Sequence, residues 1–153
     1  MTSYMPPELY ADVYGKYIPR VCVDAVVVRS EEVLMTRRAI EPELGKWHLP
    51  GGKIVRGETI DEALKRHVLH DLGVGCRVFD LLGVSEFLDQ HAVVGDYTFT
   101  MHSIMICKKV ELQRYDIRLN REEASEWQWF NCLPKDIDLV QDRFLRSHLL
   151  WLK

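Results

Sequence analysis

The chain has 153 residues, of which 47% are hydrophobic and 28% charged, and its formal net charge is −3. This length and apolar content predict one folded domain with its own core and argue against a disordered chain. The weak negative charge gives no electrostatic basis for binding nucleic acid, and no apolar run approaches a membrane span. The first residues lack the features of a secretory signal, and the cysteines form no C-x-x-C pair. We therefore expect a cytoplasmic protein that binds neither nucleic acid nor a membrane.

The N-terminal part is predicted to be helical. Residues 6–17 begin with Pro-Pro-Glu, which suits a first helical turn, and apolar and tyrosine residues recur along them. We treat residues 1–19 as an N-terminal helical segment and residues 20–153 as the main domain. The helix is expected to pack on that domain or on a partner subunit, and we expect a homodimer.

Two strands should follow, with charged residues at their ends or centre. Residues 20–28 are apolar on both faces, which is typical of a central strand, and Asp24 lies inside it. Its carboxylate is either held by a neighbouring backbone group or arginine, or contacts a substrate. The second strand, residues 33–37, leads into two arginines near a glycine loop. A guanidinium binds oxyanions in a bidentate manner, so we expect Arg38 to contact phosphate and Arg37 to be solvated.

Residues 51–74 predict a loop followed by a helix. Pro50-Gly51-Gly52 is unsuited to a helix interior, whereas Thr59 and Glu62 have the spacing of a capping box, and Gly73 should end the helix. Helical periodicity gives one buried apolar sector, formed by Ile60, Ala63, Leu64, Val68 and Leu72. Two imidazoles and a carboxylate lie on or beside that sector, namely His67, His70 and Asp71. Such polar groups facing inward are unusual, because a buried charge needs a partner.

The second half of the chain reads mainly as strands. In order, we expect two short strands within 76–88, a loop at 89–95, a strand at 96–110, a loop at 119–124, a strand at 126–130 and a helix from Asp136. His91 falls in the first of these loops and His102 in the long strand. The order of elements predicts an α/β fold with a mixed sheet between helical layers.

The spacing of Gly52, Glu58, Arg66 and Gly73 resembles the Nudix box, G-x5-E-x7-R-E-U-x-E-E-x-G-U, in which U is bulky and apolar. The W-x-x-P-G-G run just before it also resembles Nudix proteins. The resemblance implies a Nudix-type α/β/α sandwich with a mixed β-sheet. It also implies metal-dependent hydrolysis of nucleoside diphosphates linked to another moiety. Glu58 and Arg66 should then form a structural ion pair between the loop and the helix.

Three box positions depart from the pattern. His67 and His70 stand where glutamates are expected, and Asp71 replaces the last glutamate. The GDP-mannose mannosyl hydrolase branch resembles this chain, because it has lost the same two glutamates and keeps a metal ligand at the last position. That branch also has an aspartate and an arginine that match Asp24 and Arg38.

The resemblance implies a Mg²⁺ or Mn²⁺ site formed by the Gly51 carbonyl, Asp71, Glu123 and His70. Imidazole would favour zinc, manganese or later metals over magnesium, which prefers oxygen ligands. Substrate contacts are expected from Arg38, Asp24, His102 and His91. The base histidine of the branch is replaced by Ala124. His67, Asp24 and Glu123 are the alternative catalytic bases, and His67 is preferred because its ordinary pKa needs no shift.

These features favour hydrolysis of a nucleotide sugar of the GDP-mannose type. One alternative is a pyrophosphohydrolase that attacks phosphorus in another nucleotide. A second alternative, from a different class, is an inactive Nudix domain that binds a nucleotide or a protein partner.

Overall fold

The computed structural model describes residues 5–41 and 43–149. The ends of the two predicted segments, residues 1–4 and 150–153, lie outside the described residues. In chain order the elements are α1 (Pro7–Asp12), a π-helical turn η1 (Val13–Tyr17), β1 (Arg20–Arg29), β2 (Glu32–Arg38), β3 (Trp47–His48), β4 (Gly51–Lys53), α2 (Ile60–Leu72), β5 (Cys76–Val94), β6 (Tyr97–Leu112), β7 (Ala124–Phe130) and α3 (Leu139–His148).

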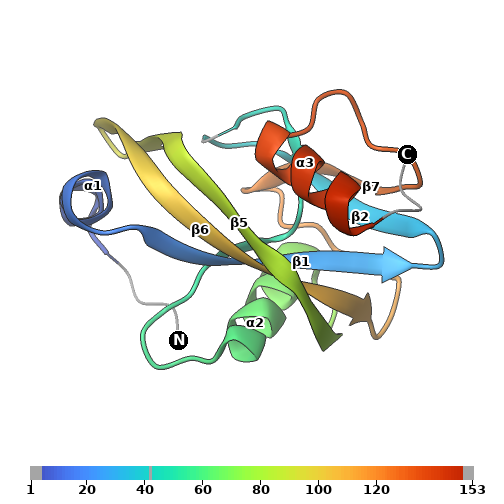
Figure 1. Cartoon of the computed structure of the whole chain (residues 1–153). Coiled ribbons are helices and arrows are strands. Elements are labelled where there is room, and N and C mark those ends of the chain that lie inside the picture. Colours follow the sequence, from blue (N-terminus) through green and yellow to red (C-terminus); the bar gives the residue numbers. More distant parts are fainter. Residues whose placement is uncertain (1–4, 42, 150–153) are drawn as a thin grey trace.

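A mixed sheet lies between helices and confirms the predicted α/β architecture. Its strands run in the order β3-β2-β1-β6-β5, with β4 also paired to β1 and β7 to β2. The β1–β6 pair is parallel, whereas β1 pairs antiparallel with β2 and β4. Helix α2 covers one face of the sheet and α3 the other (Figure 1). No helix in the described part of the chain is long and apolar enough to cross a membrane.

Strand β1 contributes to the core on both faces, which explains its apolar sequence. Alternate residues such as Cys22 and Val26 pack in the cluster that includes Phe144 of α3. The intervening residues, such as Val23, pack with Leu64 of α2. Because side chains alternate across a strand, one continuous apolar run serves two cores.

Helix α2 begins and ends where the sequence predicts. Thr59 and Glu62 form the reciprocal capping box, and Gly73 ends the helix in the left-handed conformation with φ 69°. The N-terminal helix α1 packs on its own domain, where the Tyr10 and Phe99 rings lie 6.2 Å apart. The prediction of a helix within residues 6–17 is therefore confirmed.

Several boundaries differ from the prediction: the two short strands expected within 76–88 are one strand, β5, and β7 begins at Ala124, within the loop expected at 119–124. The expected loop at 89–95 is part of β5, which pairs with β6 up to Val94 and turns only at Gly95. Register shifts within β5 interrupt the simple alternation on which the sequence prediction depended. Helix α3 begins at Leu139, not at Asp136, because the Asp138 side chain accepts hydrogen bonds from the backbone of Val140 and Gln141.

Candidate active site

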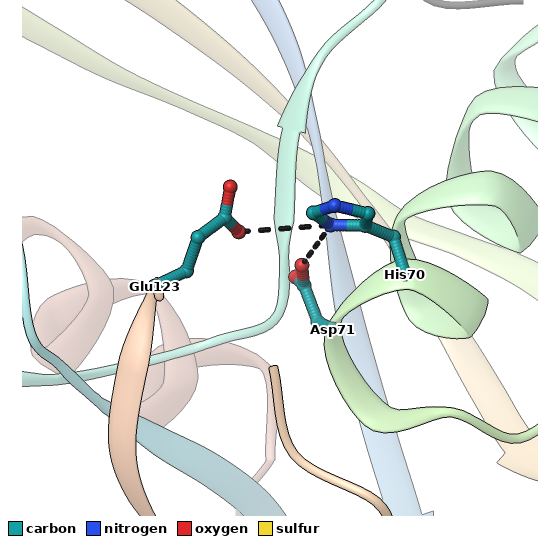
Figure 2. Close-up of side chains that lie close together, drawn as sticks. All are labelled: His70, Asp71 and Glu123. Atoms are coloured by element: carbon teal, nitrogen blue, oxygen red, sulfur yellow. Dashed lines mark hydrogen bonds and ion pairs between the residues drawn. The ribbon is translucent and has the colours of Figure 1, made fainter. Parts of the chain in front are cut away.

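Three predicted metal ligands converge between α2 and the start of β7. His70 Nδ1 lies 3.2 Å from Asp71 Oδ1 and 3.8 Å from Glu123 Oε2 (Figure 2). One possible ligand atom from each of the three residues lies within 4.8 Å of the other two. The fourth predicted ligand, Gly51, lines the same small cavity as Asp71 and Glu123. We call His70, Asp71 and Glu123 the acidic cluster.

The electrostatics of the acidic cluster suit a cation. Burial, and then the negative charge of Glu123, raise the pKa of Asp71 to about 7. A positive ion among these groups would relieve the repulsion between the two carboxylates. Carboxylate oxygens suit magnesium and manganese, and the imidazole nitrogen favours manganese. The residues present therefore fit a divalent ion, although the His70 side chain is 53% exposed and does not face inward as expected.

A second hollow, which we call the cleft, adjoins the acidic cluster and encloses about 120 Å³. Asp24 and Arg38, both expected to contact substrate, line this cleft. Arg38 also lines the acidic-cluster cavity and donates from Nε to the Ile40 carbonyl at 3.3 Å. Arg38 thus stands at the junction of the two hollows.

Asp24 is held between the glycine loop and the last helix. It is a register partner of Gly51, and a Cβ on Gly51 would lie 2.7 Å from Asp24 Oδ1. Only glycine therefore lets the loop approach the carboxylate this closely. On the other side, Gln141 Nε2 donates to Asp24 Oδ2 at 3.5 Å. Burial raises the pKa of Asp24 to about 7, although the positive charge of Arg20 opposes this shift.

Several residues of the cleft were missed by sequence reasoning. Gln141 accepts the Leu49 amide at 2.9 Å, so α3 closes the cleft from its far side. His48, expected only as a strand residue, also lines the cleft, and burial lowers its pKa to about 3. Nothing local in the sequence marks either residue. Arg20 was detectable, because it shares the alternation of Cys22 and Asp24 along β1.

His67 does not lie in either of these two hollows. Its Nε2 lies 2.9 Å from the Lys53 carbonyl, to which it donates in the matching tautomer. Burial lowers the pKa of His67. This nitrogen contacts the Lys53 backbone, and the structure does not place His67 among the residues that line the cleft or the acidic-cluster cavity.

The other two predicted histidines also lie away from the cleft. His102 Nε2 contacts Glu86 Oε2 at 2.7 Å on the surface, which is the ordinary role of a sheet histidine. His91 is exposed and is paired with Thr100 in the β5–β6 ladder, not in a loop. The structure therefore does not bring these two side chains together with Arg38.

The expected ion pair between the loop and the box helix is present. Arg66 Nη2 donates to Glu58 Oε1 at 2.6 Å, and Arg66 Nε donates to Glu58 Oε2 at 3.0 Å. Arg66 also donates to the Lys53 carbonyl, and Glu58 accepts the Val55 amide at 2.8 Å. The pair thus ties the residues that follow the glycine loop to α2.

Comparisons with known proteins identify the family of this chain. The NUDIX domain family profile matches residues 18–145. The ADP-ribose pyrophosphatase of Methanocaldococcus jannaschii is 27% identical, and the match covers 90% of this chain and 78% of the relative. The low-salt glycan biosynthesis protein Agl8 of Haloferax volcanii is 38% identical over 61% of this chain and 60% of its own length. A MutT NUDIX hydrolase structure from Burkholderia pseudomallei matches with a TM-score of 0.72 and 27% identity, covering 84% of this chain and 97% of that one.

The chain therefore belongs to the NUDIX domain family and is a hydrolase. Its Nudix fold is the one predicted from the box spacing.

Proposed function

We propose that this hydrolase cleaves a nucleoside diphosphate-linked compound with a divalent ion, and that the linked moiety is a sugar, as in GDP-mannose. The observation that carries the proposal is the continuity of the two hollows. The acidic-cluster cavity and the cleft share Arg38, His48 and Gly51. A diphosphate at this junction would meet the Arg38 guanidinium, while the attached moiety extends into the cleft. There the guanidinium would stabilise the charge that develops on the departing diphosphate.

The acidic cluster would hold the ion through Asp71, Glu123 and His70, together with the Gly51 carbonyl. A bound divalent ion would supply positive charge that polarises the diphosphate and stabilises it as a leaving group. We propose manganese ahead of magnesium, because one of the donors is an imidazole.

Asp24 is the best placed base. Of the other carboxylates in the cleft, Asp138 caps α3 and Glu43 pairs with Lys46 at 3.3 Å. Asp24 has one oxygen on Gln141 and the other beside Gly51, toward the cleft. A carboxylate within reach of a cleft water can accept the proton that the attack releases.

A pyrophosphohydrolase that attacks phosphorus is the second candidate. The relative named as an ADP-ribose pyrophosphatase favours it, whereas the relative named for glycan biosynthesis favours a sugar-linked substrate. Both candidates use the same acidic cluster and Arg38. They differ in which atom water attacks.

The test is a hydrolysis screen of nucleotide sugars and dinucleotides with Mn²⁺ or Mg²⁺ in water labelled with heavy oxygen. Label on the sugar supports attack at carbon, and label on phosphate supports the second candidate. Asp71→Asn is the matched negative control. Absence of turnover by the wild type on every compound would favour the binding-only alternative.

A homodimer and a cytoplasmic location stay predictions, as does the boundary between residues 1–19 and 20–153. Light scattering coupled to size-exclusion chromatography measures the oligomeric state. Fractionation of the source cells measures the location. Unfolding of a variant that starts at residue 20 tests the segment boundary.

A further inference from the structure

Arg20 presents a cation to the cleft, yet its hydrogen-bond partners are neutral groups. Its Nη1 donates to the Tyr10 hydroxyl at 2.9 Å, and its Nη2 donates to Gln90 Oε1 at 3.3 Å. The same Gln90 oxygen accepts a hydrogen bond from Ser103 Oγ at 2.7 Å. Arg20 Nε is buried without a hydrogen-bond partner. Among the residues that the structure describes, Arg20 forms no ion pair with a carboxylate.

Such an arrangement is costly in the absence of a ligand. A buried charge is tolerated when it is paired, and a buried donor without an acceptor loses its hydration without compensation. Lys53 adds to the local positive charge, since its Nζ lies 5.3 Å from the Tyr10 ring centroid. An oxyanion that enters the cleft would meet the Arg20 guanidinium there and provide the charge-assisted contact that no carboxylate in the described residues makes with it.

The backbone of Arg20 is offset along β1 from that of Asp24, although both side chains line the cleft. Asp24 is beside Gly51, next to the acidic cluster, and Arg20 precedes it by four residues on the same face. At roughly 3.3 Å per residue, their backbones are about 13 Å apart. Both side chains nevertheless line the same cleft, so a diphosphate whose charge is met by Arg38 and a bound ion would leave Arg20 available to a second oxyanion of the same substrate.

We propose that Arg20 binds an oxyanion, a carboxylate or a phosphate, on a part of the substrate away from its diphosphate. The proposal rests on the proposed function and narrows its substrate class to acidic compounds. Nucleoside diphosphate uronic acids and nucleotides with an additional terminal phosphate share this chemistry. Tyr10 and Gln90 act as positioning residues, because they fix the plane of the guanidinium from α1 and β5.

Calorimetric titration without divalent metal tests the proposal, because it separates binding from turnover. The first arm compares GDP-mannuronate with GDP-mannose and UDP-glucuronate with UDP-glucose. The second arm compares coenzyme A with dephospho-coenzyme A, which differ by one terminal phosphate. We expect the acidic member of at least one arm to bind about 10- to 100-fold more tightly, as a charge-assisted contact provides. The arm that shows the preference identifies the source of the oxyanion.

Three variants assign the preference to Arg20. Arg20→Met should bring the acidic and neutral members to within about threefold of each other, because it should weaken binding of the acidic member far more than binding of the neutral one. Arg20→Lys should retain part of the preference, because it keeps the charge without the planar fork. Tyr10→Phe, which keeps the guanidinium but removes one acceptor, should weaken acidic binding less than Arg20→Met. Thermal unfolding of each variant confirms that it is folded.

Several outcomes would overturn the proposal. These are equal affinities in the wild type, no binding of any compound, or an equal loss for both members in Arg20→Met. An equal loss would mean that Arg20 only braces Tyr10 and Gln90. Hydrolysis of neutral sugars without an acidic preference would overturn this proposal but keep the proposed function. Acid-selective binding without turnover by the metal-loaded protein would keep the proposal for Arg20 and overturn the proposed function as a hydrolase of these compounds.

Discussion

Gly52 lies directly against the imidazole of His67. A Cβ on Gly52 would lie 2.5 Å from His67 Cε1, which is closer than such atoms approach in folded proteins. The backbone of Gly52 does not have a positive φ, so the requirement for glycine comes from the ring and not from the conformation. The imidazole thus fills the space under the glycine loop and supports it.

We predict that Gly52→Ala destabilises the fold by about 1–3 kcal/mol, the usual cost of overpacking. Removing the ring should relieve the clash, so Gly52→Ala should cost much less in a His67→Ala background. Urea denaturation of the two single variants and the double variant measures this coupling. Additive effects would show that the ring does not set the requirement for glycine.

The Glu58–Arg66 pair should be important for stability. Their side chains are 13% and 22% exposed, so each charge depends on the other. Arg66→Met should lower the free energy of unfolding by about 3 kcal/mol, because it leaves the partly buried Glu58 carboxylate without its ion-pair partner. A double-mutant cycle with Glu58→Gln isolates the interaction. The exposed Arg146–Asp142 pair is the control and should contribute under about 1 kcal/mol.

Metal binding should depend on Asp71 and its selectivity on His70. Asp71→Asn is expected to weaken Mn²⁺ binding at least about 10-fold, since it removes the buried carboxylate of the acidic cluster. His70→Asp should improve Mg²⁺ relative to Mn²⁺, because an oxygen donor replaces a nitrogen. Calorimetry with both ions provides the measurement. An unchanged ratio of affinities would place His70 outside the coordination sphere.

The proposed function gives the role of base to Asp24 in place of His67. We predict that Asp24→Asn lowers kcat about 10²- to 10⁴-fold with metal binding retained. His67→Gln should keep turnover within a few-fold of the wild type when both proteins are assayed at a temperature at which the variant is fully folded. Steady-state kinetics on the substrate found in the labelled-water screen compares them. The opposite ranking would restore His67 as the base.

His48 should make the fold sensitive to acid. Its Nδ1 faces the Leu49 carbonyl, and burial followed by the charge of Arg38 lowers its pKa to about 3 from an ordinary value of 6.5. The folded state therefore excludes a proton that the unfolded chain binds below about pH 6.5. Stability should fall as pH drops from about 6.5 to 3, by up to about 1.4 kcal/mol per unit from this group. Urea titrations of wild type and His48→Gln at pH 7, 5 and 4 should show a shallower decline for the variant.

Features that depend on neighbouring residues were predictable from the sequence. The capping box at Thr59 and Glu62 and the stop at Gly73 are local, so their spacing suffices. The central position of β1 followed from its two apolar faces. The end of β5 did not follow, because its bulges shift side chains from one face to the other and break the alternation.

The candidate site likewise contains residues whose positions were predictable from local pattern and residues whose contacts were not. Box spacing placed Asp71 on the buried side of α2, and strand alternation placed Asp24 on the sheet face. The contact of His67 with the Lys53 carbonyl was not predictable, because periodicity indicates the side of a helix but not which backbone group a ring meets. Gln141 was missed because its contact with Asp24 is made only after the complete fold has formed.

The contact between Gln141 and Asp24 also bears on how the protein folds. The two residues are 117 positions apart, and the Leu49–Gln141 bond spans 92 positions. Contacts of such long range form late, because closing a long loop costs entropy before any contact compensates it. During synthesis the sheet and α2 can assemble while α3 is still unmade, so the nascent chain has no closed cleft. Hydrogen exchange at the Leu49 amide would report how readily α3 separates from the cleft in the mature protein.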